Sequence, residues 1–549
     1  MTAGATAGRE KILLVELTPT VPNLGRFIVM PRYGLLAIAS ILADKTDYDV
    51  KLLYEPYVGR IDAEKIARED PRYLLINGLT TSAHDNERLI ESFRNRTRDT
   101  VPVITGGEHA SVFPEDAKRY ADYILAYEAD ETVVSLLEAL EEEDPVSRDS
   151  MLSQVPGLHY RDLSGTWRFN KEPSRVERID YRYDFSVVPG SESAAGRFRT
   201  AHLPLQTSRG CKHVCSFCSW ISLYGKSGYH VRPVEDVLHD MVHAIEYTGI
   251  RNFIVTDNLF AGDAAYTEEL MHGIIRVFEG RPDKPAMTVL CRADQFTGGP
   301  GALPEKVIKL MARGGVANVS MGLESINSRS LLQMRKRTDL EKYYLAADTL
   351  RRNGIGMLAT FVAGFDGDSH EDVVNIAEFG ERIGLFTVQV YARGIMPGTV
   401  DEILSAHRNI PGRLDKYVNG HTVNILPALM LPSDLQRAIF DAAFRFHSRG
   451  DRRSALSAFR FIWRGIEPHL EGLLKLEREV LIPEKIYKWA GSGYLLDEKA
   501  LHAFTEDEER RRAFAKRSAE IFRDAELTAS VRRRIPTQAV SAIACSCSG

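Results

Sequence analysis

The sequence predicts an α/β protein with an N-terminal Rossmann-like doubly wound domain, a central partial (β/α)6 barrel and a C-terminal, mainly helical domain. Short apolar runs alternate with helix-like segments twice along the chain, and such alternation is typical of parallel sheets. Strand signals then fade after about residue 400, which predicts the helical domain. The predicted domains are 10–142, a linker with a small hairpin at 143–200, then 201–398 and 399–549.

The first alternation contains apolar runs of the length that forms buried parallel strands. These runs span 11–17, 50–54, 73–77, 101–105 and 123–126, and helical stretches lie at 34–44, 61–69, 84–95, 114–120 and 130–141. The linker carries two short strand-like runs, at 157–160 and 167–170. We therefore expect a doubly wound parallel sheet followed by a small hairpin.

The second alternation predicts six strand–helix units. The strands are expected at 205–209, 251–257, 286–292, 317–323, 356–364 and 386–392, and the helices at 233–248, 265–279, 304–313, 339–353 and 369–383. Because a closed eight-stranded barrel typically needs ~250 residues, this shorter stretch favours a partial barrel. Amphipathic helical patterns follow at 433–480 and 498–533.

Composition excludes several classes of protein. The 549 residues are 44% hydrophobic and 26% charged, which is ordinary for a globular protein. A net charge of -5 favours neither nucleic acid nor an anionic membrane as a partner. No apolar run reaches the ~18 residues that span a bilayer, and Met1 to Glu10 lacks a signal-peptide core, so a cytoplasmic location is expected.

Three of the six cysteines crowd together directly after the first strand of the second alternation. Cys211, Cys215 and Cys218 are spaced Cys-x3-Cys-x2-Cys, and barrel active sites are built on loops at this end of the strands. Soft thiolates suit an iron–sulfur cluster. The alternatives are a zinc knuckle that adds His213, or inert buried thiols. Cys291 is predicted to be a core thiol.

The pattern Cys-x3-Cys-x-aromatic-Cys, with Phe217 at the aromatic position, resembles the radical S-adenosylmethionine (SAM) superfamily over roughly 200–395. The resemblance implies a 4Fe–4S cluster whose fourth iron binds the amino and carboxylate groups of SAM, and whose electron cleaves SAM to a 5′-deoxyadenosyl radical. It also implies SAM contacts at the ends of later strands. The candidates are Phe217, Asp257, Arg292, Gly322, Glu324 and Gly364.

Three loops at the carboxyl ends of the first sheet, together with the run from Met30 to Leu36, resemble the cobalamin-binding domain that precedes some radical SAM barrels. The chain has neither Gly-x-Gly-x-x-Gly nor Asp-x-His-x-x-Gly, so the resemblance implies cobalamin without a histidine from that second motif. The implied cobalamin-binding residues are Arg32, Tyr33, Gly34, Thr80, Thr81, Ser82, Gly106, Gly107, Glu108, His109 and Glu128.

The resemblance implies a methyltransferase of the EC 2.1.1 type, which passes a methyl group from SAM through methylcobalamin to a carbon of a small natural-product precursor or a peptide. A radical cyclisation, rearrangement or oxidation with the same cofactors is the alternative, and a cobalamin sensor without a cluster is a third. A flavodoxin or ferredoxin is the expected electron donor. Trp220, Gln389 and Tyr391 are candidate substrate contacts, and a redox or metal role for the tail pair Cys545 and Cys547 is left open.

Overall fold

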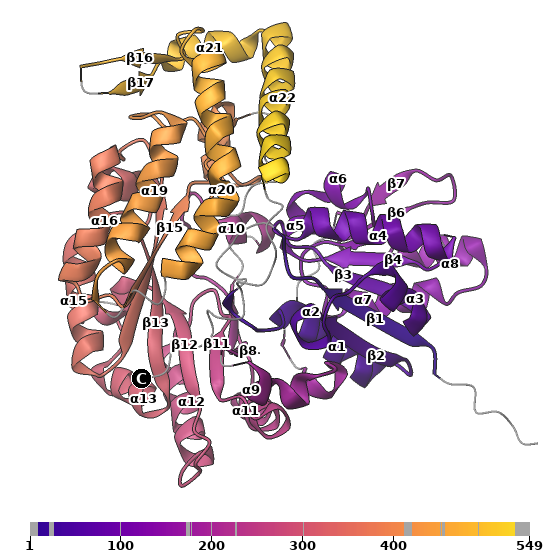
Figure 1. The fold of residues 1–549 in the computed structure, drawn as a ribbon. Helices are drawn as coiled ribbons and strands as arrows, with labels where there is room; N and C mark the ends of the chain where they lie inside the picture. The colour runs from indigo at the N-terminus through magenta and orange to yellow at the C-terminus, as the bar shows by residue number, and fades with distance from the viewer. Residues whose placement is uncertain are drawn as a thin grey trace, which may run out of the picture.

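The computed structural model describes residues 9–532, apart from 21–26, 99, 172–175, 177, 180, 199, 225–227, 300, 411–419, 451, 453–455 and 492. The tail cysteines Cys545 and Cys547 lie outside the described residues. The indigo and purple N-terminal domain stands beside the pink central domain, and the orange and yellow C-terminal helices lie at one end of the central domain (Figure 1). No described helix is long and apolar enough to cross a membrane.

The N-terminal sheet has seven strands in the order β2-β1-β3-β4-β5-β6-β7. Five strands run parallel: β1 (Lys11–Glu16), β2 (Asp49–Tyr54), β3 (Pro71–Asn77), β4 (Val103–Gly106) and β5 (Tyr123–Leu125). The hairpin of β6 (Leu158–Arg161) and β7 (Trp167–Phe169) pairs antiparallel with β5. The hairpin expected in the linker therefore extends the sheet of the N-terminal domain.

Helices cover both faces of this sheet. Ile12 and Leu14 of β1 pack in the same core as α1 (Tyr33–Lys45) and α7 (Thr132–Leu140). Leu13 and Val15 point to the opposite core, which includes residues of α3 (Ala63–Glu69) and α4 (Ala83–Thr97). Since alternate residues of a strand face opposite sides, the continuous apolar run of β1 is what a sheet covered on both faces requires.

The central sheet is an open, all-parallel, six-stranded arrangement in the order β15-β14-β13-β12-β11-β8, which confirms the partial barrel. Its strands are β8 (Leu203–Leu205), β11 (Asn252–Val255), β12 (Ala286–Cys291), β13 (Val316–Glu324), β14 (Gly356–Ala363) and β15 (Thr387–Ala392). The connecting helices include α11 (Val234–Thr248), α12 (Ala264–Val277), α13 (Glu305–Arg313), α14 (Ser328–Gln333), α15 (Leu340–Arg352) and α16 (His370–Arg382). Five of the six predicted strands are present, whereas the run expected at 205–209 is divided: Leu205 ends β8, and Ser208 and Arg209 belong to β9 (Ser208–Gly210) in a separate two-stranded sheet.

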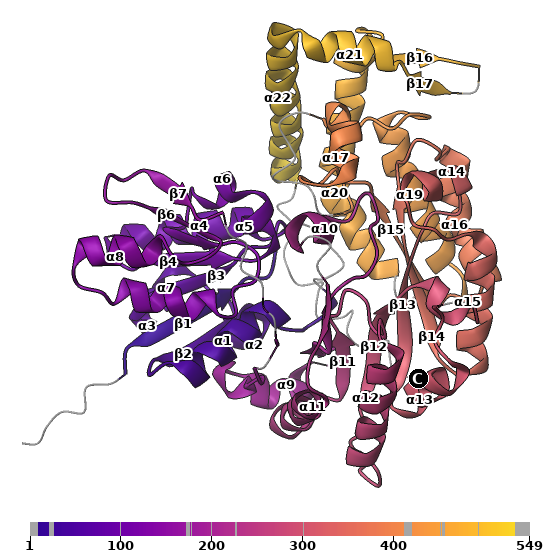
Figure 2. The same cartoon turned by 180° about the vertical axis from the view of Figure 1, so that it is seen from behind.

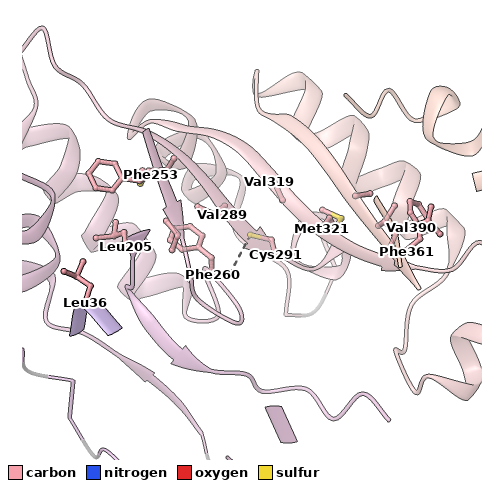
Figure 3. Close-up of a cluster of buried hydrophobic side chains, with 14 of the residues drawn as sticks. Leu36, Leu205, Phe253, Phe260, Val289, Cys291, Val319, Met321, Phe361 and Val390 are labelled. Atoms are coloured by element: carbon pink, nitrogen blue, oxygen red, sulfur yellow. Dashed lines mark hydrogen bonds between the residues drawn. The ribbon is translucent and has the colours of Figure 1, made fainter. Parts of the chain in front are cut away.

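Apolar side chains from alternate strand positions form the barrel core. Phe253, Val289, Val319 and Phe361 are all buried there, one from each of four neighbouring strands (Figure 3). Cys291 lies in the same core, and its thiol donates to the carbonyl oxygen of Phe260 at 3.8 Å. Cys291 therefore faces the core, as the sequence predicts for a small apolar side chain.

The C-terminal domain is mainly helical. It contains α17 (Val400–Ser405), α19 (Pro432–His447), α20 (Leu456–Leu476), α21 (Glu498–Glu506) and α22 (Glu508–Arg532). The stretch 433–480, which the sequence predicts as amphipathic helix, divides into α19 and α20, and an unpredicted hairpin of β16 (Tyr487–Trp489) and β17 (Tyr494–Leu496) follows. Helix α19 packs against α16 and β15 and so covers the last strand of the open barrel, as Figure 2 shows from behind.

Candidate active site

The cysteine loop begins where a short strand ends. Cys211 directly follows β9 (Ser208–Gly210), which pairs antiparallel with β10 (Tyr229–Val231). Gly210 has a φ of +94°, and a Cβ atom there would lie 1.9 Å from the carbonyl oxygen of Gly228. Only glycine fits this close approach of two backbones, so Gly210 sets the direction in which the cysteine loop leaves the barrel.

The three predicted cluster ligands lie near one another and near cations. Burial, together with the neighbouring thiols of Cys215 and Cys211, raises the pKa of the Cys218 thiol to about 11. Burial also raises the pKa of Cys211, whereas the cations Arg292 and Lys336 lower it. No three His, Cys, Asp or Glu side chains of the described residues converge on one metal-ion position. The arrangement fits a cluster because nearby cations favour the thiolates that bind iron.

Backbone hydrogen bonds hold the cysteine loop against the segment that follows α14. The Ser216 N–H donates to the Met334 carbonyl oxygen at 3.0 Å, and the Ser216 hydroxyl donates to the Gln333 carbonyl oxygen at 2.9 Å. On the other side, the Asp401 N–H donates to the Ser216 carbonyl oxygen at 3.0 Å. These bonds fix the loop between the end of α14 and α17 at the start of the C-terminal domain.

A buried network of charges joins the ends of β12 and β13 beside the cysteine loop. Arg292 Nη1 lies 3.8 Å from Cys215 Sγ, and its Nη2 donates to the Lys336 carbonyl oxygen at 2.8 Å. Lys336 Nζ pairs with Glu324 Oε1 at 2.8 Å, and both side chains are buried. A Cβ atom on Gly322 would lie 2.3 Å from that Glu324 oxygen, so the glycine makes room for the pair.

Three of the predicted SAM-binding residues are thus brought together: Arg292, Gly322 and Glu324. Asp257 has another set of partners, because it accepts hydrogen bonds from the Thr207 N–H at 2.7 Å and from the Ser208 hydroxyl at 2.6 Å. Burial raises the pKa of Asp257 to about 6. Asp257 therefore fastens the turn between β8 and β9, and its contact with SAM stays a prediction.

The end of β14 forms a second fastened turn. Asp368 accepts from the N–H groups of Gly364 at 2.9 Å and Phe365 at 3.0 Å, and Gly364 has a φ of +112°. The Phe365 ring contacts Phe217 edge-on, with a centroid distance of 6.0 Å. The guanidinium of Arg393 lies 4.5 Å from the Phe365 ring centroid. Phe217 and Gly364, both predicted SAM contacts, are therefore linked through Phe365.

A cavity of about 330 Å³ lies between the N-terminal sheet and the barrel. Its volume is in the range of small-molecule sites, ~300–1,000 Å³. The N-terminal domain lines it with Arg32, Tyr33, Gly34, Gly106, Gly107, Glu108 and Glu128, all predicted to bind cobalamin. Gly107 has a φ of +96°, and a Cβ atom on Gly78 would lie 2.3 Å from the Gly106 carbonyl oxygen. Gly78 therefore allows the close approach of the backbone at Gly106, and Gly106 and Gly107 line the cavity without side chains, which leaves room for a large ligand.

Four other predicted cobalamin residues are absent from this lining. Thr80 and Thr81 do not line the cavity, and Ser82 borders a small neighbouring cavity. His109 is fully buried, with Nδ1 3.2 Å from the Thr80 hydroxyl and Nε2 3.0 Å from Asp116 Oδ2. His109 is therefore held by protein partners at both ring nitrogens.

The barrel contributes the opposite side of the cavity. Trp220, two residues after Cys218, lines it together with Thr256, which follows β11. Trp220, a candidate substrate contact, lines the same cavity as residues predicted to bind cobalamin. The cavity therefore touches the element that directly follows the cysteine loop.

Arg209, a residue that ties the two domains together, is not predicted by the sequence. Arg209 lies two residues before Cys211, is buried, and contacts Asp130 at 3.0 Å and Glu128 at 3.1 Å across the domain boundary. The Ser219 hydroxyl also donates to Glu108 at 2.9 Å. Only the position of Arg209 next to the motif was visible in the sequence, because its partners are separated from it by 79 and 81 residues.

Gln389 and Tyr391 form a polar pair at the end of β15. The Tyr391 hydroxyl donates to Gln389 Oε1 at 2.5 Å, and the Tyr391 ring lies 5.3 Å from that of His421. Burial, and secondly the charge of Glu324, raises the pKa of Tyr391 to about 12. Tyr391 therefore lies within the electrostatic reach of Glu324, a predicted SAM residue.

Comparison with known proteins agrees with both cofactor domains. Residues 205–380 match the radical SAM superfamily model, and residues 28–137 match the B12 binding domain model. A protein of Pyrococcus horikoshii named an uncharacterized methyltransferase is 26% identical over 71% of this chain and 82% of its own. The anaerobic magnesium-protoporphyrin IX monomethyl ester cyclase of Synechocystis is 24% identical over 66% of this chain and 70% of its own.

A solved structure agrees in fold. The radical SAM methyltransferase TsrM from Kitasatospora setae, with cobalamin and a [4Fe–4S] cluster bound, has a TM-score of 0.58, with 16% identity over 95% of this chain and 100% of its own. Two family models therefore match the two domains that enclose the cavity. The chain belongs to the cobalamin-dependent radical SAM enzymes, whose cofactors are a 4Fe–4S cluster, SAM and cobalamin.

Proposed function

We propose that this enzyme transfers a methyl group from SAM, by way of cobalamin, to a carbon of a small natural-product precursor or a peptide. The observation that supports this most directly is the cavity shared by the two domains, because Gly106 and Gly107 line one side and Trp220 the other. A group carried by cobalamin in this cavity would lie beside the element that follows Cys218. Relatives named as methyltransferases agree with the proposal.

In this proposal Cys211, Cys215 and Cys218 hold the cluster, and the resident cofactors supply one-electron cleavage of SAM and a carrier for its methyl group. The chain itself provides charge and position. Arg292 and Lys336 place buried cations beside the thiols. The ion pair of Lys336 and Glu324 holds both side chains in place, where they can bind the carboxylate or a hydroxyl of SAM.

We place the substrate near Gln389 and Tyr391. Both half-buried side chains end in polar atoms that already pair at 2.5 Å, so a substrate amide or hydroxyl can replace that bond without leaving either group unpaired. A small-molecule substrate fits this half-buried pair better than a folded protein does.

The test is product analysis of the full chain after anaerobic reconstitution with iron, sulfide and hydroxocobalamin. With SAM and a strong reductant, we expect both 5′-deoxyadenosine and S-adenosylhomocysteine by mass spectrometry. Cys215→Ala should abolish deoxyadenosine because the cluster loses a ligand. Cys291→Ala is the matched control, since Cys291 is buried in the barrel core and should leave both products.

The products also separate the alternatives. Deoxyadenosine without S-adenosylhomocysteine would favour a cyclisation or another radical rearrangement. The similarity to the Synechocystis cyclase is the observation that supports this alternative. S-adenosylhomocysteine alone would favour polar methyl transfer. Neither product, together with no visible cluster absorbance, would contradict the proposal as a whole.

A further inference from the structure

A buried arginine directly after β15 connects the barrel to the first helix of the C-terminal domain. Arg393 is 1% exposed, and its N–H donates to the Ala363 carbonyl oxygen at the end of β14 at 2.8 Å. Its Nε donates to Asp401 Oδ2 at 2.9 Å, and its Nη2 donates both to the other oxygen of that carboxylate and to the Ser405 hydroxyl at 2.8 Å. Asp401 and Ser405 belong to α17 and are also buried. Because two nitrogens meet one carboxylate, the pair has a fixed geometry.

The carboxylate partner of Arg393 also holds the cysteine loop. The Asp401 N–H donates to the Ser216 carbonyl oxygen at 3.0 Å, and Ser216 directly follows Cys215. The side chain of Asp401 therefore holds the arginine, while the backbone of the same residue holds the loop between two of the predicted cluster ligands.

The guanidinium reaches the next residue of that loop through an aromatic ring. It lies 4.5 Å from the ring centroid of Phe365, and this ring contacts Phe217 edge-on at 6.0 Å. Nη1 of Arg393 also donates to the Gly364 carbonyl oxygen at 3.4 Å. A guanidinium over an aromatic face is attracted by the ring and holds its orientation. Ser216 and Phe217, two successive residues of the cysteine loop, are thus each connected to the same buried ion pair.

A second buried arginine nearby has different partners. Arg408 is 8% exposed, and its guanidinium pairs with Asp366 and with Glu498 at the start of α21. Nη1 of Arg393 lies 3.6 Å from Asp366 Oδ1, so the two arginines share one carboxylate. Arg408 joins α21 to the turn after β14, whereas Arg393 joins α17 and that turn to the cysteine loop.

Stability alone is a weak reason for an ion pair at this position. Apolar residues of similar volume often replace a buried ion pair without loss of stability, because two charges must be taken out of water. A two-nitrogen contact with a carboxylate instead adds geometric specificity. Here that geometry defines where α17, the turn after β14 and the cysteine loop meet.

We propose that Arg393 is a positioning residue for the SAM site, an inference that rests on the cluster ligands and SAM contacts of the proposed function. Paired with Asp401, Arg393 keeps Ser216 and Phe217 in one arrangement relative to Cys215 and Cys218. Without this pair the loop between the two cysteines loses two of its supports. SAM binding should then weaken, although the cysteines themselves are unchanged.

The experiment compares Arg393→Met with the wild type, both as anaerobically reconstituted full-length holoenzyme. Iron content and visible cluster absorbance should stay the same, because the three cysteines remain. Equilibrium binding of SAM should weaken about tenfold, as is usual when a residue that orients a metal site is lost. The change that SAM causes in the electron paramagnetic resonance spectrum of the reduced cluster should be smaller and broader than in the wild type.

Arg408→Met is the matched control. It removes a buried arginine from the same group of charges, so its loss of stability in urea unfolding should resemble that of Arg393→Met. Its SAM affinity and cluster spectrum should equal those of the wild type, because the partners of Arg408 lie in α21 and the turn after β14. Arg393→Lys should show an intermediate loss of SAM affinity, since lysine keeps the charge and loses the planar two-nitrogen contact.

The outcomes separate this proposal from the assignments on which it rests. Wild-type SAM affinity and cluster spectrum in Arg393→Met would overturn the positioning role, and so would equal losses in Arg408→Met. If Arg393→Met fails to fold, Arg393→Lys decides, because wild-type SAM affinity in that variant would also overturn the role. A wild-type protein without cluster absorbance would instead overturn the cluster assignment. A wild-type protein that binds SAM but forms no S-adenosylhomocysteine would overturn only the proposed methyl transfer.

Discussion

At the scale of single residues, small side chains decide where charged ones can lie. Gly322 leaves the space that the Glu324 carboxylate occupies when it pairs with Lys336. Glu324 itself has a φ of +69°, a strained conformation for a residue with a Cβ atom. Strain of this kind persists only where surrounding contacts determine it, and here a buried ion pair supplies the contact.

Gly322→Ala is therefore expected to break the pair of Glu324 and Lys336. A Cβ atom 2.3 Å from Glu324 Oε1 must displace the carboxylate, and crowding of this kind usually costs about 1–3 kcal/mol in the free energy of unfolding. SAM binding should weaken while the iron content stays unchanged. Urea unfolding and equilibrium SAM binding measure the two effects.

The control is Gly196→Ala in α9 (Ala194–Arg197), where no atom lies within 4 Å of the new Cβ. It should leave SAM binding unchanged. If Gly322→Ala binds SAM as the wild type does, the pair has no part in the SAM site.

At the scale of elements, the helices of the C-terminal domain are fastened by a buried carboxylate. Glu477, directly after α20, accepts hydrogen bonds from the Ser433 N–H at 2.7 Å and its hydroxyl at 2.8 Å, at the N-terminus of α19. Burial raises the pKa of Glu477 from 4.5 to about 7. The folded protein thus keeps a proton on Glu477 that the unfolded chain loses.

This predicts a defined pH dependence of stability. Between pH 4.5 and about 7 the folded state binds more protons than the unfolded chain, so the contribution of Glu477 falls as pH rises through that window. The shift corresponds to about 3 kcal/mol in the free energy of unfolding. Glu477→Gln should remove this slope, which urea unfolding at a series of pH values will measure. Parallel pH profiles of the variant and the wild type would contradict the assignment.

At the scale of the whole molecule, Arg209 joins the barrel to the cobalamin domain. Its guanidinium reaches Asp130 at 3.0 Å and Glu128 at 3.1 Å, and all three groups are largely buried. Removing one partner of a buried ion pair typically costs about 3–5 kcal/mol, because the other charge is left without compensation. The network thus couples the relative position of the two domains to the residue two places before Cys211.

We expect Arg209→Met to destabilise the protein by about 3 kcal/mol and to weaken cobalamin binding. Glu128 and Asp130 line the cavity, so the loss of Arg209 leaves two unpaired carboxylates in the wall of the proposed cobalamin site. The double variant Arg209→Met/Asp130→Leu should recover part of the loss, because it removes both charges. Additive losses in this double-mutant cycle, measured by urea unfolding and cobalamin titration, would show that the two residues are not coupled.

Much of this protein can be predicted from its sequence. The apolar runs around Leu14 and Phe253 predict the strands of both sheets because buried parallel strands need apolar side chains on both faces. The spacing of Cys211, Cys215 and Cys218 predicts the cluster ligands because one loop must supply all three. These features are local, and local patterns are what a sequence displays.

Other features were decided only by the tertiary structure. The partners of Arg209 lie about 80 residues away in another domain, and no local pattern marks them. The hairpin after residue 143 joins the N-terminal sheet because β5 leaves an edge to pair with, and His109 turns from the cavity because Thr80 and Asp116 hold its ring. The sequence by itself determined the two folds and predicts the cluster ligands, whereas long-range packing decided how the two cofactor domains face each other across one cavity.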